Sequence, residues 1–298
     1  MRKSIGRRVG VSLAAVAVLA GVTSCQKGAD KAEGEQGSAR TPTQALTAAY
    51  KKTAAAKSAK VTMALSMPAS MPGGGETKMS GVMGWDPMAM DMTMDQSPLG
   101  ARAEGAEKTH MIWLDNVVYM DMGKRSEALD GKRWGKIDLR AAATLAGDDK
   151  LTKQLTAGLG DGNQDPAQQL AMVLGSPNVK HLGAGEVNGQ HAEHYKGTLT
   201  ADEALASLKT AEALPPAERE KLIANIKKAG VKGYDYDVWV NGQDYPVKMD
   251  VGVSTPQGRI DTTTTFSDYG AKAAVQAPPA DDTVDLMQAL KEFMGRGK

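Results

Sequence analysis

The chain has 298 residues, with 36 Lys and Arg against 35 Asp and Glu, and a single cysteine. This near-neutral balance excludes the strongly basic surface that nucleic-acid binding requires, and one cysteine excludes an internal disulfide. Only 4% of the residues are aromatic whereas 17 are methionine, so aliphatic and thioether side chains have to fill the core.

The first 24 residues have the layout of a secretory signal peptide. Four basic residues precede an apolar run from Val9 to Ala20, which is too short for a transmembrane helix of about 20 residues. The run ends in Val22-Thr23-Ser24-Cys25, which resembles the lipobox of bacterial lipoproteins. We therefore expect removal of residues 1–24 and acylation of Cys25, with palmitate among the chains that anchor the protein at the extracytoplasmic face of the cell membrane.

The remainder divides into three predicted parts. Residues 25–40 comprise the lipidated Cys25 and a flexible polar tether, residues 41–277 form an α+β domain, and residues 278–298 form a tail with a short amphipathic helix. Without the signal peptide, 32 Lys and Arg stand against 35 Asp and Glu. Attachment to the membrane therefore depends on the acyl chains and not on attraction to anionic lipid.

The domain begins with a predicted helix and continues as strands. Thr41-Pro42-Thr43-Gln44 is a capping-box start for a helix that runs to about Ser58. From Val61 the apolar residues recur with period two, and the segment Met88–Met94 has methionine at every second position. Met111–Met122 is a predicted hairpin with two apolar faces, which turns at Asp115-Asn116.

The second half of the domain alternates between helical and strand patterns. Leu151, Leu155 and Leu159 indicate a helix, and further helix starts follow at residues 165, 200 and 215. Strand patterns cover residues 179–199, 234–254 and 259–269, with turn signals at Asn188-Gly189 and Asn241-Gly242, and Pro278-Pro279 is expected to end the sheet. This order predicts an α+β fold with a single curved antiparallel sheet that carries helices on one face.

Twelve of the 17 methionines fall between Met63 and Met122, and this stripe has three interpretations. The methionines can fill a closed core, line a cavity that adapts to flexible apolar chains, or bind Cu(I) through soft sulfur ligands. Same-face residues on one strand lie about 6.6 Å apart, so a single ion could not bind a whole stripe. Core and cavity wall are not separable from the sequence.

Several segments together resemble the LppX/LprG-type cell-envelope lipoproteins, relatives of the LolA/LolB lipid carriers. They are the lipobox at Cys25, the hairpin around Val117-Val118-Tyr119, Val187–His191 with His194–Thr198, and Val238–Gly242 with Tyr245-Pro246-Val247. The resemblance spans roughly residues 42 to 277. It implies a half-barrel closed on its concave face by helices, around a cavity that receives the acyl chains of lipids or lipoglycans. That family has no catalytic residues to carry over.

We therefore expect a membrane-anchored carrier of an amphiphilic envelope lipid, with residues 151–174 as its lid. The expected apolar wall consists of Met63, Leu65, Met67, Met90, Met92, Met94, Met111, Met120 and Val238. The alternatives are a regulatory module with an envelope protein partner and, less favoured, copper handling. We expect no enzyme activity and no cofactor, because the chain has no Ser elbow, Walker motif or cysteine nucleophile. We expect no metal site, because His191 and His194 fall on opposite faces of a strand.

Overall fold

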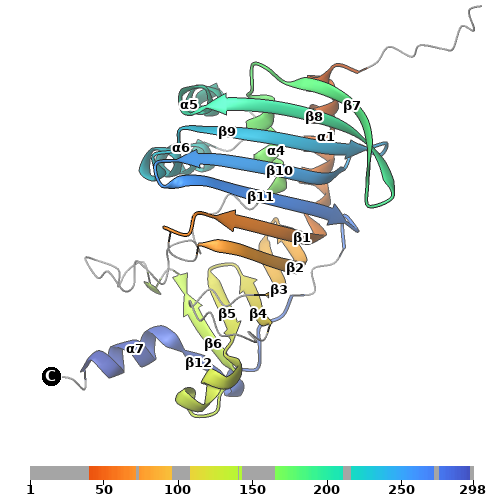
Figure 1. Ribbon diagram of the computed structural model, residues 1–298. Coiled ribbons are helices and arrows are strands. Elements are labelled where there is room, and N and C mark those ends of the chain that lie inside the picture. Colours follow the sequence, from red (N-terminus) through yellow and green to blue (C-terminus); the bar gives the residue numbers. More distant parts are fainter. Residues whose placement is uncertain are drawn as a thin grey trace, which may run out of the picture. The chain divides into compact units, whose positions relative to one another are not determined.

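The computed structural model describes residues 40–71, 74–95, 108–139, 141–142, 165–210, 216–271 and 275–295. All of them belong to one compact unit that extends from Arg40 to Lys298 and consists of a large sheet with helices (Figure 1). The signal peptide, Cys25 and the tether as far as Ala39 lie outside the described residues. The predicted helix at Leu151–Leu159 also lies outside them.

The described helices and strands follow one another much as the sequence patterns predict. The helices are α1 (Pro42–Ala56), η1 (Gly123–Leu129), α4 (Pro166–Leu174), α5 (Ala201–Thr210), α6 (Pro216–Ala229), η2 (Ala280–Asp282) and α7 (Leu286–Gly295), where η marks a 3-10 helix. The strands are β1 (Ser58–Met67), β2 (Gly75–Trp85), β3 (Met88–Met94), β4 (Thr109–Leu114), β5 (Val117–Asp121), β6 (Trp134–Asp138), β7 (Lys180–Val187), β8 (Gln190–Thr200), β9 (Gly233–Asn241), β10 (Pro246–Thr255), β11 (Gly258–Ser267) and β12 (Thr283–Asp285).

The strands form one sheet in the order β12-β6-β5-β4-β3-β2-β1-β11-β10-β9-β8-β7. All neighbours are antiparallel except β12 and β6, which run parallel. The two outermost strands are not paired with each other in the part of the chain that the structure describes, so the curved sheet is unclosed. The pairing of β1 with β11, in which Lys60 lies opposite Ser267, joins the two halves of the sequence. The expected α+β class with one large, mostly antiparallel sheet is confirmed.

Local capping chemistry explains where the helices begin. At α1, the Gln44 amide donates to Thr41 Oγ1 at 3.2 Å and the Thr41 amide donates to Gln44 Oε1 at 2.9 Å, which is the predicted capping box. Thr200 and Glu203 make the equivalent pair of bonds at α5, at 2.8 and 3.2 Å. The Asp165 carboxylate caps α4 by accepting the Ala167 amide at 2.7 Å. These ends therefore depend only on residues close in sequence.

Turn residues explain two of the hairpins. Asn188 and Gly189 both have positive φ, at 50° and 77°, as the turns favoured in two-residue hairpins require. The predicted turn at Asn241-Gly242 is also present, but its connection extends to Tyr245. There the Asn241 side chain accepts hydrogen bonds from the amides of Gln243 and Tyr245, both at 3.0 Å.

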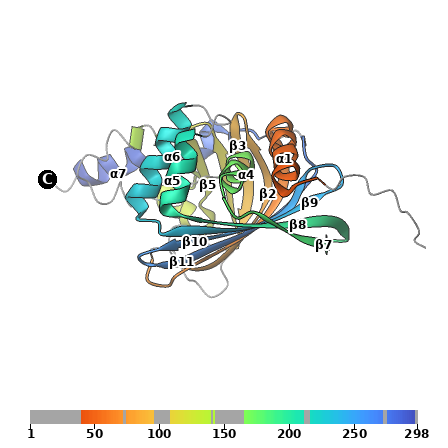
Figure 2. The same cartoon turned by 90° about the horizontal axis from the view of Figure 1, so that it is seen from above.

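Helices α1, α4, α5 and α6 lie on one side of strands β8–β11 (Figure 2). Each contributes side chains to the same core as the sheet: Leu46 and Ala49 from α1, Leu170 and Val173 from α4, Leu208 from α5, and Ile226 from α6. The buried face of every helix is therefore turned toward the sheet, which places the core between the two layers.

One expectation about the end of the domain is wrong. Pro278-Pro279 does not end the sheet, because β12 follows it and pairs in parallel with β6, with Thr283 opposite Trp134. The next helix, α7, inserts Met287 into the core, where it is buried. A three-residue strand carries too short an alternation to be recognised from the sequence, and its pairing partner lies about 150 residues away.

Candidate functional site

The sheet register places the predicted apolar wall on one face, which we call the inner face. Residues directly opposite each other on neighbouring strands point to the same face, and the pairs of the apolar wall are continuous across the sheet. Met120 lies opposite Met111, which lies opposite Met92, and Val238 reaches Met63 through Met249 and Thr264. Strands as distant in sequence as β1 and β9 therefore contribute to one surface.

Most of this apolar wall is fully covered. Met92 and Val238 are 0% exposed, and the other buried members are Met63, Met90, Met94, Met111 and Met120. Leu65 and Met67, toward the end of β1, are half-buried. The apolar wall thus has a sealed centre and a partly open margin at the end of β1.

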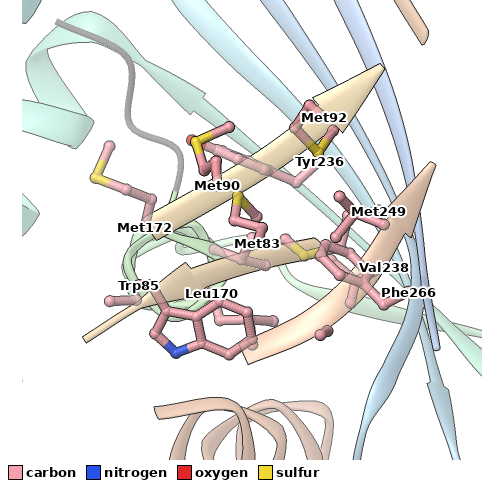
Figure 3. Close-up of a cluster of buried hydrophobic side chains, with 14 of the residues drawn as sticks. Met83, Trp85, Met90, Met92, Leu170, Met172, Tyr236, Val238, Met249 and Phe266 are labelled. Atoms are coloured by element: carbon pink, nitrogen blue, oxygen red, sulfur yellow. The ribbon is translucent and has the colours of Figure 1, made fainter. Parts of the chain in front are cut away.

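Further residues of this surface were not singled out from the sequence. Figure 3 shows Met83 and Trp85 from β2, Tyr236 from β9, Met249 from β10, Phe266 from β11 and Met172 from α4 in the same buried cluster. For β2, the alternation Met79-x-Gly81-x-Met83-x-Trp85 indicates that these residues share one face of a strand. Tyr236 and Met249 also stand in alternating strand segments, whereas Met172 lies on a helix and Phe266 follows a run of four threonines.

Gly81 brings two of these strands unusually close together. It lies opposite Met92, and a Cβ atom at position 81 would collide with the Asp91 carbonyl oxygen and lie 2.9 Å from the Met92 Cα. Only glycine leaves room for β3 at this point. The methionine pairs Met79–Met94 and Met83–Met90 lie on either side of this close approach.

Two tyrosines add polar atoms to the inner face. Tyr234 and Tyr236 are two residues apart on β9, and their rings stack with centroids 5.9 Å apart. Burial raises the pKa of Tyr234 to about 12, and burial together with the neighbouring Tyr234 raises the pKa of Tyr236 further. Both phenols therefore remain protonated at any physiological pH.

The opposite face of the β4–β5 hairpin, on the outer face of the sheet, carries a pocket. Its volume is about 350 Å³, and it is lined by Leu114, Asp115, Asn116, Val117, Tyr119 and Asp138. The sequence correctly predicted that Leu114, Val117 and Tyr119 share a face opposite Met111 and Met120. This second apolar surface is thus separated from the apolar wall by the thickness of the sheet.

Charged and aromatic residues cover other parts of the outer face. His194 stacks on Trp239 at 4.2 Å between centroids, and Lys248 Nζ lies 4.2 Å from the same Trp ring. Asp237 pairs with His194 at 2.7 Å and with Lys196 at 2.8 Å. These side chains are therefore ion-paired or stacked with one another on the outer face.

Asp121, also on the outer face, forms an ion pair with Arg133. Its Oδ2 accepts hydrogen bonds from Arg133 Nη2 at 2.7 Å and Nε at 3.0 Å, and its Oδ1 accepts the Gly123 amide at 3.0 Å. Partial burial raises the pKa of Asp121, but these hydrogen bonds and the charge of Arg133 outweigh it, so the pKa is lowered.

The described residues include His191 and His194 but not Cys25. His191 is exposed whereas His194 is paired with Asp237, and the described ranges contain no group of three His, Cys, Asp or Glu arranged to hold a metal ion. Cys25, the predicted acylation site, lies outside the described residues. Within those residues, no helix has the length and apolar character needed to cross a bilayer.

Relatives of this chain by sequence come from Streptomyces. No family model matches the chain. An uncharacterized 31.2 kDa protein from the rplA-rplJ intergenic region of Streptomyces griseus is 31% identical over 260 residues, which cover 84% of this chain and 81% of the relative. The chain belongs to the family of this Streptomyces protein. A Streptomyces coelicolor protein named "Putative lipoprotein" is 25% identical over 97% of this chain and 98% of its own length.

Solved structures similar to this chain include two mycobacterial proteins. The Mycobacterium tuberculosis lipoprotein LppX covers 79% of this chain and 98% of its own, at 11% identity and a TM-score of 0.44. LprF from Mycobacterium bovis covers 80% of this chain and 97% of its own, at 12% identity and a TM-score of 0.45. LppX is a member of the lipoprotein group that the sequence resembles.

Proposed function

We propose that the protein is an exported, membrane-anchored lipoprotein that binds an amphiphilic envelope lipid between its sheet and its helices. The lipid's acyl chains would lie against the apolar wall and its polar head would stay at the open margin. The protein would act by binding and release, without catalysing a reaction. The observation that carries this proposal is the continuous, buried, methionine-rich inner face of an unclosed sheet that has helices on one side.

The curvature required for such a site is supported by the extent of the core. Five steps between neighbouring strands separate β3 from β9, which is about 24 Å along a flat sheet at about 4.8 Å a step. Met90 and Met92 of β3 and Tyr236 and Val238 of β9 belong to one buried cluster, which is continuous through the strands between them (Figure 3). A half-barrel with the helices on its concave face, as the resemblance implies, would bring these strands toward each other.

The chemistry of the apolar wall suits a flexible guest. Methionine has three rotatable side-chain bonds and a polarizable sulfur, so a methionine-lined space repacks at little cost around chains of different shape. The described part of the predicted lid, α4, is a nine-residue helix whose residues Leu170 and Val173 are fully buried against the core. Movement of α4 away from the sheet would expose the apolar wall to an entering chain.

Anchoring at Cys25 would keep this domain beside its lipid source. The lipobox-like tetrad before Cys25 supports lipidation, and so does a relative that carries the lipoprotein name. Two acyl chains hold a protein on a membrane stably, because each buried methylene contributes about 0.8 kcal/mol. The polar stretch of residues 26–40 would act as a flexible tether that lets the domain extend away from its membrane anchor.

Native mass spectrometry with organic extraction of the Cys25→Ala chain tests this function. We expect co-purified or added lipid on the protein. Leu65→Trp, which adds bulk at the open margin, should reduce lipid uptake, whereas Ser66→Trp, one residue along on the exposed face of the same strand, should not. Preparations from several hosts that show only the apo mass and take up no added lipid would refute the proposal.

A second candidate function is a module that regulates an envelope protein partner. The outer-face pocket beside Val117 and Tyr119 favours it, because this surface stays accessible whatever fills the inner face. Crosslinking the acylated protein in membranes tests it. A stoichiometric partner that is lost in Val117→Asp but kept in Leu65→Trp would support this function, and identical crosslinks in both variants would refute it.

A further inference from the structure

A row of directly opposed residues crosses the inner face from β1 to β6, and we call it the cross-strand row. Its members, each opposite the next, are Val61, Gly81, Met92, Met111, Met120 and Gly135. The four steps from β2 to β6 measure about 19 Å along a flat sheet at about 4.8 Å a step, and half of a bilayer's hydrocarbon core is about 15 Å thick. The cross-strand row is therefore about as long as one acyl chain.

The cross-strand row ends at β6, where β12 and α7 lie beside it (Figure 1). A Cβ atom at position 135 would point to the inner face, where it would lie 2.8 Å from Leu286 Cδ1 and 3.0 Å from Met122 Sδ. Leu286, the first residue of α7, thus occupies the space above Gly135 that a side chain would otherwise fill. The next residue, Met287, is 4% exposed and belongs to the same core. Side chains of α7 therefore lie across the β6 end of the row.

Polar contacts fix the start of α7 on β6. Asp285 Oδ1 accepts hydrogen bonds from the amides of Met287 and Gln288, both at 3.0 Å, and so caps the helix. Asp285 Oδ2 forms an ion pair with Lys136 Nζ of β6 at 3.3 Å, and the two residues are also paired in the sheet. Leu286, which follows Asp285 directly, is held in place by these contacts, whereas the methionines of the row have flexible side chains.

We infer that Leu286 forms the end wall of the acyl-chain site and limits the length of chain that the protein accepts. This inference rests on the proposed function and narrows its ligand by chain length. A chain that follows the cross-strand row gains apolar contact until its terminal methyl group reaches Leu286. A longer chain would have to displace Leu286 or leave part of its length outside the site. The methionines would adapt to the shape of the chain, and Leu286 would set its length.

Competition among lipids that differ only in chain length tests this inference. The full chain carrying Cys25→Ala is incubated with an equimolar mixture of dimyristoyl, dipalmitoyl, distearoyl and diarachidoyl phosphatidylglycerol, and native mass spectrometry identifies the bound lipid. Each further methylene that becomes buried strengthens binding about fourfold, so occupancy should rise with length up to a limit and then stop rising. Leu286→Ala should move that limit to longer chains and raise the occupancy of the next member at least about fourfold.

Two variants serve as controls. Leu286→Met keeps an apolar side chain of similar volume and should restore the parent's limit, and Gln288→Ala, at an exposed position of the same helix, should leave it unchanged. If Leu286→Ala has the parent's length profile, or loses all four lipids to the same extent, the inference is overturned and the lipid-binding function stands. If the parent chain binds none of the four lipids, the proposed function is overturned together with the inference.

Discussion

Replacement of Gly81 by alanine tests the packing that underlies the apolar wall. The added methyl group would meet the Asp91 carbonyl oxygen and the Met92 Cα, which are backbone atoms of the neighbouring strand. Backbone atoms in a paired strand cannot rotate away as a side chain can. Strands β2 and β3 would have to separate locally, which disturbs the neighbouring pairs Met79–Met94 and Met83–Met90.

Two opposing effects determine how much Gly81→Ala changes the free energy of unfolding. Alanine in place of glycine stabilises by about 0.4–1 kcal/mol through the unfolded chain, whereas forcing an extra carbon into a packed site typically costs about 1–3 kcal/mol. Because the clash here is with backbone, we take the upper part of that range, which leaves a net loss of about 2 kcal/mol. For a domain of this size the melting temperature should fall by about 4–8 °C.

Thermal unfolding followed by circular dichroism measures this difference. Gly185→Ala is the matched control, since Gly185 also lies in a strand but nothing lies within 4 Å of an added Cβ. We expect the control to melt at or slightly above the parent temperature. If Gly81→Ala were as stable as Gly185→Ala, the close approach of β2 and β3 at Gly81 would be refuted, and with it the tight packing of the methionine pairs beside it.

Four further predictions follow from individual sites. Met92→Ala should lower the free energy of unfolding by about 2–5 kcal/mol in urea titrations while Met92→Leu costs less than about 1.5 kcal/mol, and similar values for both would contradict full burial. Because hydrogen bonds from Arg133 lower the pKa of Asp121, its stabilisation is complete above an unfolded pKa near 4 and is lost as the pH falls through the lower folded value. The melting-temperature gap between parent and Asp121→Asn should therefore shrink from pH 7 to pH 3, and a constant gap would refute this. In an alkaline titration followed at 295 nm, Tyr234→Phe should remove a transition near pH 12, and an unchanged profile would contradict its burial. Cys25→Ala should move the exported protein from the membrane fraction to the soluble fraction and abolish palmitate labelling, whereas labelling that persists would exclude Cys25 as the acylation site.

Local features of the sequence were sufficient to predict where helices begin and which residues share a face in the strands with the clearest alternation. Capping bonds join residues at most three apart, as at Thr41 and Thr200, and a hairpin such as Asn188-Gly189 depends on two φ angles. Alternation likewise separates the methionines of β3 from its polar residues, because side chains on a strand point to opposite faces in turn. These interactions are short in sequence, so the residues that make them are visible together.

The tertiary structure decided what those faces meet. Period two shows that Met90 and Met92 share a face, but only the pairing of β1 with β11 brings them into one core with Val238. The parallel pairing of β12 with β6 joins segments about 150 residues apart, and the outer-face pocket forms only where β4, β5 and the end of β6 lie side by side. Such contacts form only when the chain folds, since burial and hydrogen-bond satisfaction belong to an environment and not to a residue's place in the sequence.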